Sequence, residues 1–355
     1  MPTGTTEKIR LGITQGDTNG IGLEVIIKTF MDPLMLEICT PVLFGSQKTF
    51  SFHRKAMNVE MRFNPIRSAE TATPNQFNIV NAYEEDIPVD FGTATEISGK
   101  HALKSIEAAC DALDQKKIDA IVTAPINKHN IQSPEFQFKG HTDYLEMRYK
   151  SAALMLMCAD KFRVGVATGH VPIANVSAIL STDKIIQKIR QMHKSLIEDF
   201  GIRKPKIAVL GLNPHAGDNG VIGNEEQSVI IPAITLAKGE GIFAMGPYSA
   251  DGFFGANMHS KFDGVLAMYH DQGLVPFKTI AFESGVNYSA GLPIIRTSPD
   301  HGVGYDIAGK NLANESSFRS AVYLACDIFK TKIQEKEITA NPLKALSKNE
   351  REYGN

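Results

Sequence analysis

The chain has 355 residues, of which 43% are hydrophobic and 21% charged, a composition that is ordinary for a soluble globular protein and excludes an intrinsically disordered chain. Lys and Arg number 37 against 39 Asp and Glu, giving a formal net charge of −2, which argues against a broad footprint for nucleic acid. At roughly 100–200 residues per domain, this length predicts two domains or one large one.

In chain order, short apolar runs alternate with segments of helical periodicity. Residues 8–14 and 118–123 are predicted to be strands, with a helix over 99–113 between them. Thr182 is the predicted N-cap of a second helix. Two further strands are predicted over 207–212 and 264–268, and the polar tail 331–355 is expected to be helical in its middle and frayed at its end. The apolar stripe of the second helix is Ile185, Ile189, Met192, Leu196 and Phe200.

The apolar segments are short. The run Ala152–Ala159 falls far below the ~20 residues that span a bilayer, and the first residues show no signal-peptide pattern. We therefore expect a cytoplasmic protein with neither membrane nor nucleic acid as a partner. The four cysteines form no CxxC pair and are expected to be buried apolar residues; they are Cys39, Cys110, Cys158 and Cys326.

Alternating strands and helices indicate an α/β protein with a mostly parallel sheet and short antiparallel additions. Four loops rich in Gly, Pro and His follow predicted strands. Because ligands gather outside the carboxyl ends of strands in open α/β sheets, we expect these loops to converge on one cleft. The loops are 123–125, 169–172, 212–217 and 269–273.

Three of these loops carry His170, His215 and His270. Three imidazoles could hold one divalent metal and leave positions open for a substrate. The alternative is that each histidine caps a strand or hydrogen-bonds within its turn. No HxxxH spacing decides between these interpretations.

Two further groups of polar residues suit an anion. His141 and Thr142 follow a lysine and a glycine, a pattern that favours anion binding; alternatively, Thr142 is the N-cap of a helix, whose N-terminus would itself attract anions. Lys278, Asn287 and Arg296 lie in or beside turns and suit a phosphate together with a carboxylate. The alternative for them is a solvated surface.

A glycine-rich turn, Gly16-x-x-x-Gly20-x-Gly22, follows the first predicted strand. It lacks both the Walker lysine and the spacing of a dinucleotide fold, and no GxGxxG opens a strand–helix unit elsewhere. A Rossmann site is therefore not expected, and a nicotinamide cofactor would have to bind through another loop system.

Five motifs in order resemble the family of 4-hydroxythreonine-4-phosphate dehydrogenases, enzymes of pyridoxal 5′-phosphate (vitamin B6) biosynthesis. The resemblance spans residues 8–330, and within it four positions depart from the residues common in the family: Gln15, Asn19, Leu23 and Ala124. The motifs are Gly16-Asp17-x-x-Gly20-Ile21-Gly22-x-Glu24, Gly140-His141-Thr142, Asn213-Pro214-His215-Ala216-Gly217, Tyr269-His270-Asp271-Gln272-Gly273 and Gly291-Leu292-Pro293-Ile294-Ile295-Arg296-Thr297-Ser298.

The segment His301–Asn314 also looks like the adenine-side NAD loop of isopropylmalate and isocitrate dehydrogenases, whose non-Rossmann fold the family shares. The resemblance implies a two-domain α/β fold of that kind with mixed, mostly parallel sheets. We expect a cofactor-side domain from residues 1–135 with 300–355. Residues 136–299 would form the central domain for substrate, metal and dimerisation.

The resemblance also implies roles for particular residues. It makes His170, His215 and His270 the ligands of one divalent ion (Zn, Co, Mn or Mg) at a homodimer interface that takes ligands from both subunits. The candidate catalytic residues are Asp251, Asp271 and Lys278, with the base left open between Asp271 and Lys278. Substrate-binding positions are His141, Thr142, Lys278, Asn287 and Arg296. NAD would be bordered by His301, Gly302, Asp306, Ile307, Ala308, Gly309, Lys310 and Asn314.

The family reaction oxidises 4-phosphooxy-L-threonine with NAD, and loss of CO2 then gives 3-amino-2-oxopropyl phosphate. We expect this reaction here. One alternative is a dehydrogenase of the same family for another 4-phosphorylated hydroxy acid, such as erythronate or threonate 4-phosphate. Two others are a phosphate acyltransferase of related fold and a non-catalytic metal-binding protein. The physiological metal and the preference for NAD over NADP stay open.

Overall fold

The computed structural model describes residues 8–340, in which strands and helices alternate. The strands are β1 (Arg10–Thr14), β2 (Thr40–Gly45), β3 (Asn64–Ile66), β4 (Asn78–Asn81), β5 (Ala120–Thr123), β6 (Leu154–Ala159), β7 (Phe162–Thr168), β8 (Lys206–Leu210), β9 (Phe243–Tyr248), β10 (Gly264–Tyr269), β11 (Val286–Ala290) and β12 (Arg296–Pro299). The helices are α1 (Gly22–Met31), α2 (Met35–Ile38), α3 (Gln47–Ala56), α4 (Glu96–Asp114), α5 (His141–Tyr149), α6 (Val176–Ile179), α7 (Thr182–Glu198), α8 (Ile231–Gly239), α9 (Ala250–Gly255), α10 (His270–Ala281) and α11 (Ser316–Ala340).

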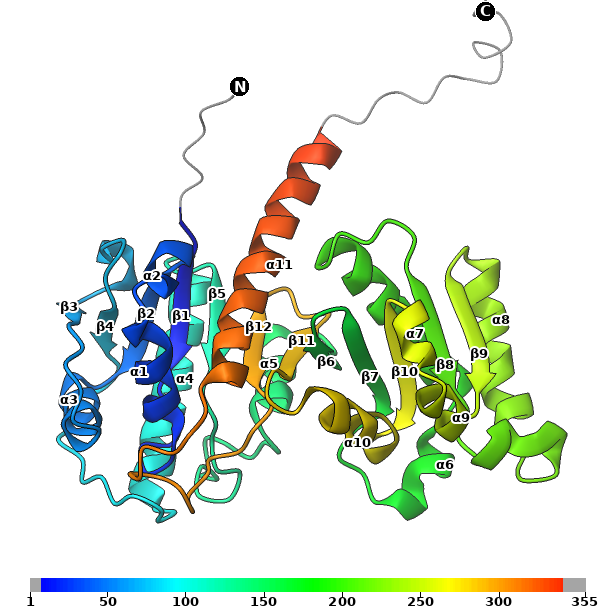
Figure 1. Ribbon diagram of the computed structural model, residues 1–355, viewed down its shortest axis with the longest axis horizontal. Helices are drawn as coiled ribbons and strands as arrows, with labels where there is room; N and C mark the ends of the chain where they lie inside the picture. The colour runs from blue at the N-terminus through cyan, green and yellow to red at the C-terminus, as the bar shows by residue number, and fades with distance from the viewer. Residues whose placement is uncertain (1–7, 341–355) are drawn as a thin grey trace, which may run out of the picture.

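One sheet of twelve strands runs through the whole molecule (Figure 1), in the order β3-β4-β2-β1-β5-β12-β11-β6-β7-β10-β8-β9. The neighbours are parallel except in the central run β12-β11-β6-β7, whose three pairs are antiparallel. The mixed, mostly parallel α/β fold is therefore confirmed, as a single continuous sheet. The division into a domain of 1–135 with 300–355 and a domain of 136–299 stays a prediction.

Six elements were predicted from local pattern and are confirmed: β1, α4, β5, α7, β8 and β10. One boundary was wrong. Thr182 is already helical, and Ser181 is the N-cap, because its backbone is extended and its side chain accepts a hydrogen bond from the Lys184 backbone N–H at 3.2 Å. The predicted stripe of α7 is buried at Ile185, Ile189, Met192 and Leu196, whereas Phe200 lies beyond the end of the helix.

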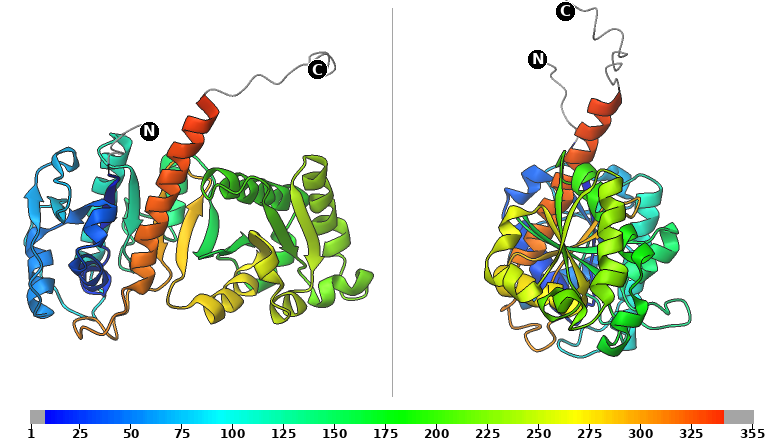
Figure 2. Two further views of the ribbon diagram at one scale, coloured as in Figure 1. Left: turned by 45° about the horizontal axis from the view of Figure 1, so that its top comes forward. Right: turned by 90° about the vertical axis from the view of Figure 1, so that its right-hand side faces the viewer.

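Side chains alternate between the two faces of the sheet and build separate cores there. On one face, a continuous cluster includes side chains from α1, α7, α8 and α11. On the other face, one cluster packs under α4 and α5 and another under α9 and α10. Adjacent strands rotate steadily, so the strands fan out when the molecule is viewed end-on (Figure 2). The break between the two clusters of the second face leaves room for a cavity between α5 and α10.

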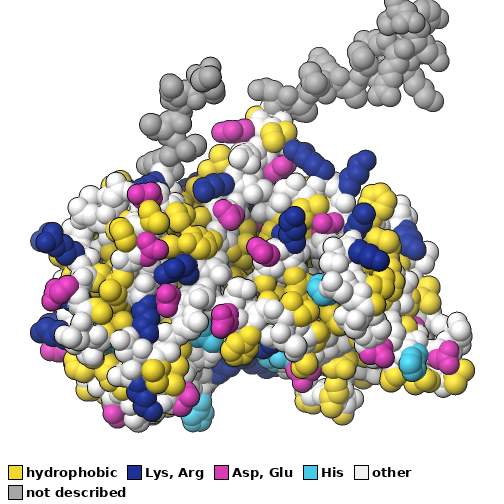
Figure 3. All heavy atoms as spheres, in the orientation of Figure 1, with side chains coloured by type: hydrophobic (Ala, Val, Ile, Leu, Met, Phe, Trp, Pro, Cys, Tyr) yellow, Lys and Arg dark blue, Asp and Glu magenta, His cyan; other side chains and the backbone are white. Residues whose placement is uncertain are grey.

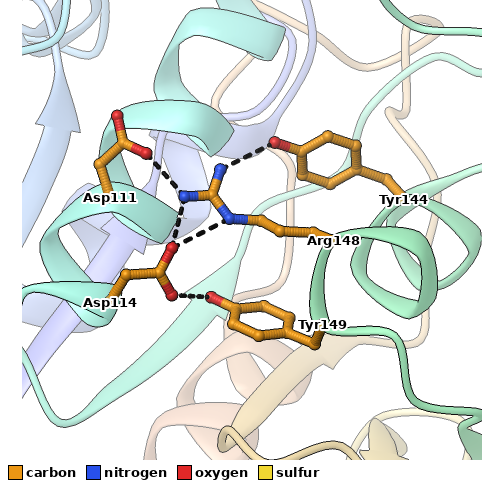
Figure 4. Close-up of polar contacts among 5 residues, drawn as sticks. All are labelled: Asp111, Asp114, Tyr144, Arg148 and Tyr149. Carbon is orange, nitrogen blue, oxygen red and sulfur yellow. Dashed lines mark hydrogen bonds and ion pairs between the residues drawn. The ribbon is translucent and has the colours of Figure 1, made fainter.

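An ionic clamp holds α5 against α4. The Arg148 guanidinium contacts Asp111 at 2.6 Å and Asp114 at 2.5 Å, and it also donates to the Tyr144 hydroxyl at 3.2 Å (Figure 4). Tyr149 donates to the other oxygen of Asp114 at 2.9 Å. Because several charged hydrogen bonds share one planar group, the clamp fixes the direction of α5 and so the position of the helix N-terminus.

The C-terminal tail is helical as far as it is described. Helix α11 continues to Ala340, which confirms helix within 331–340, while the predicted frayed end lies outside the described residues. The four cysteines are free thiols and are buried, as predicted. Among residues 8–340, no helix combines the length and apolar character that a membrane span requires.

One buried histidine makes stability depend on pH. His53 is 2% exposed, its Nε2 lies 2.8 Å from the Thr18 carbonyl oxygen, and burial lowers its pKa from 6.5 to about 4. Below pH 6.5 the unfolded chain takes up a proton that the folded chain excludes until about pH 4, so stability falls as the pH falls through this window.

We expect this histidine to account for about 2 kcal/mol of the loss in unfolding free energy between pH 7.5 and pH 5. Urea titrations of wild type and His53→Gln at both pH values measure it, because glutamine can donate to Thr18 without titrating. An equal loss in the two proteins would contradict the assignment.

Candidate active site

A cavity of about 290 Å³ opens between α5 and α10. Its floor comes from β12, β11 and β6, where the register places Asn287 beside both Ser298 and Met157. Its walls include the N-terminus of α5, the loop after β5 and the first residues after β7 and β10. Three of the four predicted loops therefore meet here, and loop 212–217 is not part of the lining.

Arg296 lies in the floor as a buried cation with neutral neighbours. It is 2% exposed, and its guanidinium donates to Thr123 Oγ1 at 2.7 and 3.0 Å and to Ser289 Oγ at 3.2 Å. Burial lowers its pKa from 12.5 to about 10, yet it stays charged at neutral pH. A buried charge is stabilised by an opposite charge, so this position is built for an anionic ligand.

The N-terminus of α5 also faces the cavity. His141, Thr142 and Gly140 line it, and Gly140 rather than Thr142 occupies the N-cap position. The predicted alternative of Thr142 as N-cap is therefore wrong. His141 Nε2 is buried without a hydrogen-bond partner, and burial, with Arg296 second, lowers the pKa of the imidazole well below 6.5. A neutral imidazole at a helix N-terminus offers an N–H group where the dipole favours an anion.

An ion pair faces the same space. Lys278 Nζ lies 3.2 Å from Asp300 Oδ1, and both residues line the cavity. Burial raises the pKa of Asp300, against the opposing effect of Lys278. On the floor, Asn287 Oδ1 is buried without a hydrogen-bond partner. The pair supplies a proton donor and a proton acceptor side by side, and the amide supplies an unused acceptor.

Two of the three predicted metal ligands come together. The rings of His170 and His270 have centroids 5.6 Å apart at the cavity wall. His270 Nδ1 lies 2.7 Å from Asp271 Oδ1, which leaves Nε2 as the nitrogen that faces a ligand. Asp271 itself is 76% exposed at its side chain and is not among the residues that line the cavity.

The third predicted ligand lies elsewhere in the chain. His215 begins a run of five residues with φ between 42° and 80°, a left-handed turn that ends at Asn219. Glu226 is 2% exposed and holds this loop by accepting backbone N–H groups of Leu212 and Asn213, both at 2.7 Å. His215 is exposed and close enough to Asp251 to lower the pKa of that carboxyl, although the Ser249 hydroxyl lowers it more.

Within a single copy of residues 8–340, the His, Cys, Asp and Glu side chains form no group of three or more that could hold a metal ion. His170, His215 and His270 therefore do not assemble in one chain. Asp251 is likewise absent from the lining of the cavity. A three-histidine site would therefore need ligands from two subunits, which is also what the family resemblance implies.

The predicted cofactor residues form one loop between β12 and α11. His301 and Gly302 line the cavity, and the loop continues outward from there. Ala308 is buried and Ile307 half-buried. Asp306, Gly309, Lys310 and Asn314 are exposed on the loop surface. His301 Nε2 is buried without a partner, and burial lowers the pKa of this imidazole. The loop thus leads from the cavity to solvent, as an extended cofactor requires.

Several lining residues were not proposed from the sequence, among them Lys128 and Asp300. Asp300 directly precedes the predicted cofactor loop that begins at His301, and this adjacency is the sequence signal that could have identified it. Lys128 carries no motif, and only the fold brings it near His141 and His170, whose pKa values it helps to lower. Including Lys139, Lys278 and Arg296, the lining cations exceed its two carboxylates, Asp143 and Asp300. Figure 3 shows histidine and basic side chains gathered at the hollow between the two lobes.

The chain is similar in sequence to proteins of one family. Residues 37–325 match the family described as the pyridoxal phosphate biosynthetic protein PdxA. Over 339 residues the chain is 50% identical to a 4-hydroxythreonine-4-phosphate dehydrogenase of Bacteroides thetaiotaomicron, covering 95% of this chain and 93% of that one. A relative in Oceanobacillus iheyensis, provisionally named D-threonate 4-phosphate dehydrogenase, is 37% identical and covers 92% of this chain and 100% of its own length.

Solved structures show the same fold. The crystal structure of 4-hydroxythreonine-4-phosphate dehydrogenase from Klebsiella pneumoniae superposes with a TM-score of 0.81 at 30% identity, covering 92% of this chain and 99% of that one. Isocitrate dehydrogenase from Methylococcus capsulatus superposes with a TM-score of 0.50 at 11% identity, over 94% of this chain and 89% of that one. The second likeness concerns the fold alone.

Proposed function

The chain belongs to the family of the pyridoxal phosphate biosynthetic protein PdxA, and we propose that its cavity binds 4-phosphooxy-L-threonine for oxidation by NAD. The activity is that of a 4-hydroxythreonine-4-phosphate dehydrogenase, an oxidoreductase of pyridoxal phosphate biosynthesis. The secondary alcohol loses a hydride to NAD and a proton to the protein. The resulting β-keto acid then loses CO2 and gains a proton, which leaves 3-amino-2-oxopropyl phosphate. This membership sets aside the acyltransferase and non-catalytic alternatives.

The observation that carries the proposal is a buried arginine without an acidic partner in a cavity rich in cations. Arg296 donates hydrogen bonds to the hydroxyl groups of Thr123 and Ser289, and the unpartnered His141 Nε2 belongs to a residue that lines the same cavity. The substrate brings a phosphate and a carboxylate, whose oxygens match these donors. Binding the two anionic ends leaves the carbon that carries the alcohol between them, held for reaction.

Acid–base chemistry is assigned to the pair Lys278 and Asp300. Both line the cavity and lie 3.2 Å apart, whereas the Asp271 carboxylate lies outside the lining and orients His270 instead. Of the two bases left open by the sequence, the geometry favours Lys278. The pair can take up the hydroxyl proton and return one to the carbon after CO2 has left.

A divalent ion fits the histidines on the wall. His170 and His270 would hold it, since their ring centroids lie 5.6 Å apart and Asp271 orients His270 in the way that an outer carboxylate orients a ligating imidazole. When bound, Zn, Co, Mn or Mg would polarise the alcohol oxygen and favour loss of its proton.

A homodimer would complete the site. The left-handed turn presents an exposed His215 beside Asp251, away from its own cavity. In a symmetric dimer each copy can offer this edge to the cavity of the other, which would provide the third imidazole. His301, Gly302 and the rest of the loop through Asn314 would border NAD.

Turnover is followed by NADH absorbance at fixed NAD, with and without a chelator. We expect fast, chelator-sensitive reduction of NAD with 4-phosphooxy-L-threonine and at least about tenfold lower kcat/KM with erythronate 4-phosphate, because the amino group contributes binding energy. D-Threonate 4-phosphate is the third substrate, since one relative bears that name. Preference for a substrate without the amino group would move the enzyme to the second candidate function, and NADH from none of them would contradict both.

A further inference from the structure

The glycine-rich motif Gly16–Glu24 is buried. Gln15, Asp17, Thr18 and Asn19 are 0% exposed, so this turn cannot cradle a phosphate from solution. Its glycines instead allow the backbone of another segment to pack closely against the turn. A Cβ on Gly20 would lie 2.2 Å from the Val303 side chain and 2.6 Å from the Val303 carbonyl oxygen. The motif therefore packs directly under the loop His301–Asn314.

Three members of the motif hold that loop at three points. The Ile21 backbone N–H donates to the Val303 carbonyl at 2.9 Å. The Tyr305 hydroxyl donates to Asp17 Oδ2 at 2.8 Å. The Ala313 backbone N–H donates to Glu24 Oε1 at 2.8 Å. The contacts span almost the whole loop, so its shape depends on the motif.

Asp17 is the centre of this arrangement. Its Oδ2 accepts from Tyr305, from Asn130 Nδ2 at 2.8 Å and from Ser98 Oγ at 3.1 Å, and its Oδ1 accepts from the Asn19 backbone N–H at 2.9 Å. All four donors are neutral, so a buried negative charge is satisfied by hydrogen bonds that three separate segments must provide. Asn19, one of the departures from the family, ties in residues 90–95 through its side chain.

We propose that the Gly16–Glu24 motif positions the cofactor loop, and that the hydrogen bond from Tyr305 to Asp17 is a positioning contact for NAD. The inference rests on the proposed function, because it takes His301–Asn314 to be the cofactor loop. Asp17 is fully buried and so does not contact NAD itself, and Tyr305 is its hydrogen-bond donor from the cofactor loop. Loss of this contact frees the loop at its middle, and NAD must then restore the loop's shape as it binds.

Two variants test the contact against a matched control. Tyr305→Phe and Ser98→Ala each remove one hydroxyl that donates to the same oxygen of Asp17, but only Tyr305 lies in the cofactor loop. We expect Tyr305→Phe to raise KM and Kd for NAD about tenfold, with kcat and the substrate KM within about twofold of wild type. Ser98→Ala should leave kcat, the substrate KM, and both the KM and the Kd for NAD within about twofold of wild type.

Asp17→Asn separates positioning from a direct contact of Tyr305 with NAD. If Tyr305 acts through Asp17, the double variant with Tyr305→Phe costs no more in NAD binding than the larger single change. NADH fluorescence titration gives Kd independently of turnover. Equal effects of Tyr305→Phe and Ser98→Ala, an unchanged Kd in Tyr305→Phe, or additive effects in the double variant would overturn the inference while wild type still turns over. A wild-type enzyme that binds no NAD would overturn the proposed function as well.

Discussion

Replacing Arg296 by methionine is expected to lower kcat/KM for the phosphorylated substrate at least about 100-fold, since truncating one partner of a buried charged contact costs about 2–5 kcal/mol. The folded protein should be as stable as wild type or more stable. The depressed pKa of about 10 means that burying the cation costs about 3 kcal/mol in the empty site. Methionine removes that cost and keeps much of the volume.

Steady-state NADH kinetics and urea unfolding measure the two effects of Arg296→Met. Arg163→Met is the control, because Arg163 is half-buried over the Phe200 ring and does not line the cavity; it should lose stability and keep its kcat/KM. Arg296→Lys tests whether the planar guanidinium is needed, because lysine keeps the positive charge but cannot donate two parallel hydrogen bonds from one planar group. Unchanged kcat/KM in Arg296→Met would remove Arg296 from the substrate site.

Removing the imidazole of His215 or His270 is expected to lower turnover more than about 100-fold while the protein stays folded. Even the loss of a residue that only orients a metal ligand lowers metal affinity or activity about 10–100-fold. The two inactive variants, His215→Ala and His270→Ala, should complement each other when co-expressed with different tags. In a two-fold dimer that shares its sites, each mixed dimer retains one complete site, so random mixing recovers about a quarter of wild-type activity.

The matched control pairs His170→Ala with His270→Ala. Both rings lie on the same cavity wall, so the mixed dimer has no complete site and should stay inactive. Native mass spectrometry confirms that mixed dimers have formed, and metal content measured on each variant gives a readout besides turnover. Recovery in the control pair, or none in the first pair, would contradict a site shared between subunits. Full activity of His215→Ala without metal would refute its assignment as a ligand.

Local sequence determined six elements of the fold, and two of them, β5 and β10, lead into the cavity. β1, β5, β8 and β10 are short apolar runs closed by turn residues, and α4 and α7 show helical spacing, so neighbouring residues suffice to define them. His170 and His270 were singled out from sequence by the apolar runs before them and the turns around them, and both line the cavity. Arg296 was expected in or beside a turn, whereas it begins β12 and is buried. The N-cap of α7 was missed by one residue, because Ser181 and Thr182 are both capping residues.

Only the tertiary structure decided which of these residues meet. The order of strands places β6 beside β11 under one cavity, although β6 ends more than 120 residues before β11 begins, and no local pattern encodes that order. It places His215 away from His170 and His270, and it buries Arg296 among hydroxyl groups. It also buries the glycine-rich motif Gly16–Glu24 beneath the loop His301–Asn314. Burial and the contacts of distant segments set these properties, and a single segment of sequence contains neither.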